Sequence, residues 1–122
     1  MRSAKLTLCL IVLALAAPLL AGAQLTPMKL RALIYRTDPC LAHIIDVEGG
    51  RWQPTESYGG GYGDVYASYG LPQADPGTKM ASAGADWRTN PWTQLRWAEQ
   101  YAVERYGSTC AAWQFREANG YW

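Results

Sequence analysis

The sequence predicts one small, mostly α-helical domain of about five helices behind an N-terminal export signal. Three observations predict this class: helix start and stop residues bound five short segments, apolar residues recur in them at helical spacing, and a single Gly/Tyr-rich stretch interrupts them. A length of 122 residues fits one domain. The hydrophobic share of 49% is too high for an intrinsically disordered chain.

Residues 1–23 have the three parts of a secretory signal peptide. Two basic residues come first, residues 6–20 carry no charge, and the small residues 21–23 form a cleavage site. The apolar segment is short for a membrane span, which needs about 20 residues, and Pro18 would break its last turn. We therefore expect a secreted or periplasmic protein with a mature domain at residues 24–122. Retention of the segment as a membrane anchor is the alternative.

The mature domain is nearly neutral and keeps two of the three cysteines. Its formal charge changes from +1 to −1 when the two basic residues of the signal leave, which gives no support for binding to nucleic acid or to an anionic membrane. Cys40 and Cys110 remain, and in a small exported domain such a pair indicates a disulfide rather than a metal site. His43 is the single histidine, so a zinc site and a Ser-His-Asp triad are poorly supported. We expect a monomer without metal or cofactor, and without membrane contact after signal cleavage.

Capping residues followed by proline mark the helix starts, and glycines mark the stops. The pairs Thr26-Pro27, Asp38-Pro39 and Asn90-Pro91 are start signals, and Ser108 or Thr109 can cap a last helix. We predict helices from Pro27, over 40–48, over 77–80 with Gly84 as the stop, over 91–106 and through Ala118. The apolar pattern of the long helix predicts that Trp92 and Trp97 belong to the core.

Residues 57–70 hold four of the eight tyrosines among closely spaced glycines. Two interpretations remain open from composition. The stretch is either a low-complexity, disordered segment or a Gly/Tyr-rich loop or short hairpin over a cleft, in which Gly permits tight turns and Tyr supplies flat faces with polar tips.

Glu48 is the first candidate for catalysis because it continues an apolar helical face formed by Leu41, Ile44 and Ile45. Partial desolvation favours the protonated form of a carboxyl group, and that form can donate a proton to a glycosidic oxygen. The alternative is a solvated Glu at a fraying helix end, just before Gly49-Gly50.

No second carboxylate can be paired with Glu48 from spacing alone. Asp46 lies about 200° round the helix from Glu48 and cannot share its site. The nearest others in the sequence are Glu56, Asp64 and Asp75. His43 also faces away from Glu48, and we expect it to be solvated or locally bonded.

Four segments, in order, resemble the lysozyme-like lytic transglycosylases. CLAHIIDVEGG (40–50) is similar to their apolar helix ending in E-S-G, and SYGLPQADPGTKM (68–80) to their G-L-x-Q motif. The segment 84–113 resembles the small exported and phage-encoded members, and the ending NGYW (119–122) resembles their terminal G-W-Y. A shorter run, 48–52, is similar to the resuscitation-promoting factors, more distant wall-cleaving domains.

The resemblance implies a lysozyme-like α+β domain that cleaves the MurNAc–GlcNAc β-1,4 bond of peptidoglycan glycan strands, its expected partner. It assigns Glu48 as the one acid and base, which forms 1,6-anhydromuramic ends. It places Gln73, Tyr69 and Trp113 at the cleft, where the Gln73 amide supplies hydrogen bonds. Trp52, next to the acid, either packs or stacks on sugar.

Two departures from the family pattern stand out: Gly49 replaces the usual Ser, and 25 positions separate Glu48 from Gln73. Two alternatives to the transglycosylase remain. One is a hydrolytic muramidase on the same fold with Asp64 or Glu56 as base. The other is a peptidoglycan-binding module without catalysis.

Overall fold

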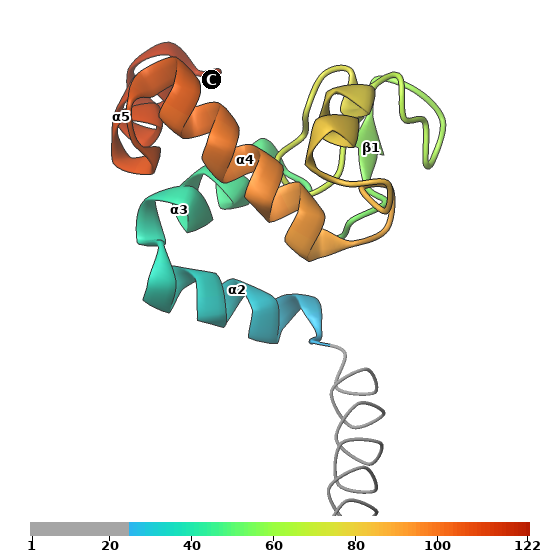
Figure 1. Cartoon of the computed structure of the whole chain (residues 1–122), viewed down its shortest axis with the longest axis horizontal. Helices are drawn as coiled ribbons and strands as arrows, with labels where there is room; N and C mark the ends of the chain where they lie inside the picture. The colour runs from blue at the N-terminus through green and yellow to red at the C-terminus, as the bar shows by residue number, and fades with distance from the viewer. Residues whose placement is uncertain (1–24) are drawn as a thin grey trace, which may run out of the picture.

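The computed structural model describes residues 25–122 (Figure 1), and the predicted signal peptide lies outside them. Its elements are, in order, α2 (Pro27–Thr37), α3 (Pro39–Glu48), β1 (Ser57–Tyr58), β2 (Ser68–Tyr69), the 3-10 helix η1 (Gly77–Ala83), α4 (Pro91–Tyr106) and α5 (Thr109–Asn119). The predicted mostly α-helical class, with about five helices and a short hairpin, is confirmed. Within residues 25–122 no helix is long and apolar enough to cross a membrane.

The start and stop signals act as the sequence predicts, because they are local. Thr26, Asp38, Asn90 and Ser108 each accept a hydrogen bond from a backbone N–H in the first turn of the following helix. The glycines after α3, α4 and α5 adopt left-handed backbone conformations and end these helices.

Helix α3 lies between α2 and α5, while α4 contacts α5 at one end and η1 beyond it (Figure 1). The apolar faces of these elements meet in a common core with Leu71 of the loop after β2. Its largest aliphatic members are Leu30, Ile34, Leu41, Ile45, Leu71, Met80 and Leu95. Ile44 of α3 belongs to a second, smaller cluster, in which it packs with Ala102 of α4 and Ala112 of α5.

The Gly/Tyr-rich stretch is ordered as a two-stranded antiparallel hairpin, with Ser57 opposite Tyr69. A fully buried side chain of α4, Gln94, holds the hairpin to the helices. Its Oε1 accepts from the Leu71 N–H at 2.9 Å, and its Nε2 donates to the carbonyls of Pro54 and Trp87. A Cβ on Gly70 would lie 2.6 Å from that Oε1, so this position requires glycine.

The prediction for Trp92 is wrong, whereas Trp97 is buried as expected. Trp92 is 47% exposed because it stands in the first turn of α4, where Thr93, Gln94 and Leu95 take the inward positions. His43 is exposed and bonded to Tyr35, which confirms the expectation of a locally bonded histidine.

The predicted disulfide between Cys40 and Cys110 is confirmed, with the two Cα atoms 4.9 Å apart. It joins the first turn of α3 to the first turn of α5. The Thr109 hydroxyl donates to Asp38, the N-cap of α3, at 3.0 Å and strengthens the same junction.

Replacement of both cysteines by serine should lower the free energy of unfolding by about 4 kcal/mol, because the bridge closes a separation of 70 residues in the unfolded chain. Urea titration with and without a reductant measures this. The reductant should bring the wild type to the value of the variant and leave the variant unchanged. Equal unfolding midpoints for the two oxidised proteins would contradict the prediction.

Candidate active site

A cavity of about 220 Å³ opens at the carboxyl end of α3. Segments far apart in the sequence meet there: the end of α3, the turn after the hairpin, η1, α4 and the residues after α5. The lining residues are Glu48, Ser68, Pro72, Gln73, Asp75, Lys79, Trp97, Tyr101, Gly120, Tyr121 and Trp122. Two of the predicted site residues, Glu48 and Gln73, are therefore brought together.

Glu48 reaches this cavity because α3 stops directly after it. Gly49 has a φ of +81°, which only glycine adopts without strain, and turns the chain away from the helix axis. Gly50 then passes so close to the hairpin that a Cβ on it would lie 2.5 Å from the carbonyl oxygen of Gly70. Both glycines are thus needed to place Glu48 beside the loop that carries Gln73.

The Glu48 carboxylate is paired with Arg116 of α5. The arginine Nε donates to Oε1 at 2.5 Å, and the two side chains are only 18% and 20% exposed. The predicted partial burial of Glu48 is present, but its cationic partner was missed. In this arrangement Oε1 of Glu48 is a hydrogen-bond acceptor, and the cation beside it opposes addition of a proton to the carboxylate.

Gln73 combines a structural role with an unused acceptor. Its Nε2 donates to the carbonyls of Gly70 at 2.8 Å and Glu56 at 3.1 Å, so both N–H groups hold the loop. Its backbone lies in the left-handed region, at a φ of +52°, a conformation that costs about 1–3 kcal/mol for a residue other than glycine. Among the described residues its buried Oε1 has no partner. Gln73 can thus offer the site a hydrogen-bond acceptor through this amide oxygen.

Tyr69, Trp52 and Trp113 do not line the cavity. Tyr69 is buried, donates its hydroxyl proton to the Arg88 carbonyl at 2.6 Å and packs edge-on against Trp87. Trp52 is buried too, and Trp113 stacks on His43 with ring centres 5.1 Å apart. The resemblance placed Tyr69 and Trp113 at the cleft. In this chain the contacts of Tyr69 with Arg88 and Trp87, and of Trp113 with His43, hold the two rings outside the cavity lining. The burial of Trp52 favours packing over sugar stacking for that residue.

Four other aromatic residues line the cavity instead: Trp97, Tyr101, Tyr121 and Trp122. Trp97 and Tyr101 stack on each other with centres 4.9 Å apart, and Trp122 meets Tyr101 edge-on at 5.2 Å. The spacing of four residues between Trp97 and Tyr101 puts both on one face of α4, which is the signal that could have found this pair. Trp122 comes from the far end of the chain and has no such local signal.

Asp75 is the second carboxylate of the lining, and Lys79 supplies a cation. Glu56 and Asp64, which the muramidase alternative favours, are not among the lining residues. Tyr58 lies over the helix end: a Cβ on Gly49 would be 3.9 Å from its hydroxyl oxygen. A hydroxyl group thus lies near the place where the resembled family has its Ser.

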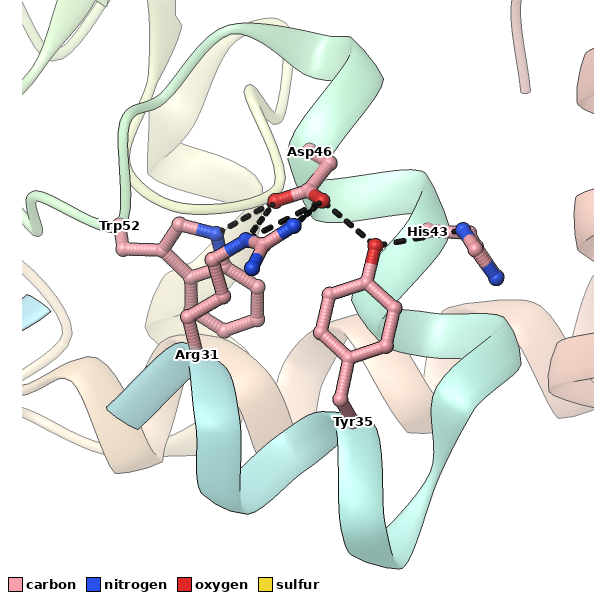
Figure 2. A network of polar contacts seen from close by, with 5 residues as sticks. All are labelled: Arg31, Tyr35, His43, Asp46 and Trp52. Atoms are coloured by element: carbon pink, nitrogen blue, oxygen red, sulfur yellow. Dashed lines mark hydrogen bonds and ion pairs between the residues drawn. The ribbon is translucent and has the colours of Figure 1, made fainter. Parts of the chain in front are cut away.

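A second polar cluster lies around Asp46, on the side of α3 that faces α2 (Figure 2). Glu48 instead pairs with Arg116 of α5, as the angle between the two residues on the helix predicts. Arg31 pairs with this carboxylate through two nitrogens, at 2.9 and 2.7 Å, and the Trp52 indole N–H and the Tyr35 hydroxyl also donate to it. Burial raises the pKa of Asp46, but the hydrogen bonds from Arg31, Tyr35 and Trp52 outweigh it and lower the pKa to about 2. The cluster ties α2 to α3.

Comparison of the chain with family models, with curated proteins and with solved structures yields no match. Among residues 25–122 no group of three or more His, Cys, Asp or Glu side chains is arranged to hold a metal ion. The chemistry of the site is therefore argued from the residues of this chain.

Asp46→Asn should lower the free energy of unfolding by about 1 kcal/mol at pH 7, after allowance for screening of a partly exposed group. A carboxyl group whose pKa falls on folding stabilises the protein above its unfolded value, near 3.8, and loses that contribution as the pH drops to about 2. Urea titrations from pH 7 to pH 2 should show the two proteins converging over that range. A constant gap down to pH 2 would contradict the prediction.

Proposed function

We propose that the domain is an exported peptidoglycan lytic transglycosylase with Glu48 as its acid and base. The observation that carries this proposal is a carboxyl group, four-fifths buried at the end of an apolar helix, in a cavity lined by four aromatic residues. Aromatic faces with polar tips suit the stacking of sugar rings, and a sheltered carboxyl group suits proton transfer to a glycosidic oxygen.

In the proposed reaction the protonated Glu48 donates its proton to the glycosidic oxygen as the bond from C1 to that oxygen breaks. The C6 hydroxyl of the same muramoyl sugar then attacks C1, and its proton returns to Glu48. A 1,6-anhydro end forms without water, so one carboxyl group serves both steps. Neither step needs a cofactor.

Hydrolysis is the second candidate, and Asp75 is the observation that favours it. An inverting or retaining glycosidase uses two carboxyl groups across the scissile bond, and Asp75 lines the same cavity as Glu48. In this alternative Asp75 replaces Glu56 and Asp64 as the base that activates water.

The disulfide supports folding in an oxidising compartment. Together with the three-part pattern of residues 1–23, it supports export to the periplasm or beyond the cell, where peptidoglycan lies. The proposal does not depend on whether the signal is cleaved or retained.

Glu48→Gln should reduce the clearing of a peptidoglycan gel by at least about 100-fold, because general acid–base catalysis contributes about 10²–10⁴ in rate. Glu104→Gln, on the exposed side of α4, is the matched control and should keep full activity. Mass spectrometry of the wild-type products should find anhydromuramic ends. Reducing ends, lost on Asp75→Asn, would instead identify a muramidase.

The hypothesis of a wall-binding module without catalysis predicts a different result in the same assay. Purified protein would then sediment with peptidoglycan yet leave it intact, and Glu48→Gln would change neither result. That outcome rejects both enzymatic proposals.

A further inference from the structure

The pair between Glu48 and Arg116 raises a chemical difficulty for the proposed reaction. A guanidinium that donates to a carboxyl oxygen at 2.5 Å favours the charged form of that group, whereas the first step needs a proton on it. The guanidinium cannot release its own proton, because arginine stays charged in proteins. While it holds Oε1, Arg116 therefore opposes addition of a proton to Glu48, and its displacement removes that opposition.

The surroundings of α3 explain why the resting protein keeps this cation in place. The carboxyl end of a helix carries a partial negative charge, and α3 has no basic residue in its last turn. Arg116 supplies the missing cation from α5: its Nη2 lies 3.5 Å from the Val47 carbonyl, while its Nε holds Glu48. It is 20% exposed, so a ligand can reach it.

We propose that Arg116 is a gate operated by the substrate: an anionic group on the bound glycan draws the guanidinium away from Glu48, which can then take up the proton it donates. This inference rests on the proposed function and names the feature of the substrate that the site requires. Arg116 is a positioning residue, since it acts through Glu48.

The displacing group must be an anion rather than a hydroxyl. A charge-assisted hydrogen bond is roughly twice as strong as a neutral one, and a carboxylate can match the two parallel N–H groups of arginine. A sugar hydroxyl offers neither the charge nor the second acceptor. Glycan strands that carry carboxylates on their lactyl-peptide side chains therefore open the gate, whereas neutral chito-oligosaccharides of the same backbone leave it shut.

Other charged groups near Glu48 do not provide this function. Lys79, from η1, and Asp75 line the cavity. Neither is hydrogen-bonded to Glu48, whose one ion pair within residues 25–122 is with Arg116. Lys79 can attract an anionic glycan strand into the cavity. This attraction changes the affinity for the strand but leaves Glu48 paired with Arg116.

The experiment compares kcat and KM on soluble peptidoglycan strands and on chito-oligosaccharides of matched length. The wild type should turn over the anionic strand with much the higher kcat. In Arg116→Gln this preference in kcat should fall by about tenfold or more, the size of one charge-assisted hydrogen bond. The fall should come from a gain on the neutral glycan. Arg116→Lys, which keeps a charge without the two-pronged geometry, should lie between the two proteins.

Arg36→Gln, at an exposed arginine of α2, is the matched control and should keep the wild-type preference. Thermal unfolding checks that each variant is folded, and Arg116→Lys carries the test if Arg116→Gln is not. An equal loss of kcat on both glycans in Arg116→Gln means a purely structural pair and overturns the gate. If the wild type cleaves no peptidoglycan, the proposed function is rejected together with this inference. If the wild type cleaves both glycans with equal kcat, the gate is rejected but the proposed function is not.

Discussion

The link between α3 and α5 is the constraint on which the candidate site depends. Cys40 and Glu48, near the two ends of α3, meet Cys110 and Arg116 of α5, so the two helices run in the same direction. One end is covalent and the other is an ion pair. Because the disulfide fixes the Cys40 end, any separation of α3 from α5 is greater at the Glu48 end. A small aliphatic core is marginal on its own in a domain of this size, and the bridge holds the site's geometry where packing alone would not.

The features that the sequence predicts correctly are those whose determining interactions are local. Caps, proline starts and glycine stops act within a few residues, which is why the helices and the position of Glu48 at the end of α3 are predicted correctly. Arg116 was missed because it stands 68 positions from Glu48, and no periodicity links the two. Tyr69 and Trp113 show the reverse problem: a motif supplies the residue type, but contacts particular to this chain decide which way each ring turns.

The hairpin and the turn after it place the remaining polar groups of the site at an energetic cost. The fully buried side chain of Gln94 makes three hydrogen bonds to the backbone around this segment. Gln73 adopts a left-handed backbone conformation, and both N–H groups of its side-chain amide donate to carbonyls. The buried Oε1 of Gln73 has no donor among the described residues. Such an unsatisfied acceptor destabilises the fold unless a donor binds to it. That cost is explained if the donor is a group of the ligand.

In the proposed reaction, the charges of the site would also couple ligand binding to proton uptake. Glu48 and Asp75 supply two negative charges, and Arg116 and Lys79 supply two positive ones, so the site is balanced while it is empty. An anionic side chain on the glycan brings a third negative charge into a partly desolvated space. Like charges that are held together disfavour ionisation, so the complex gains stability when one carboxyl group takes up a proton. A neutral glycan leaves the balance unchanged and supplies no such drive. The charge that is proposed to displace Arg116 would therefore also favour the protonated acid that the proposed first step requires.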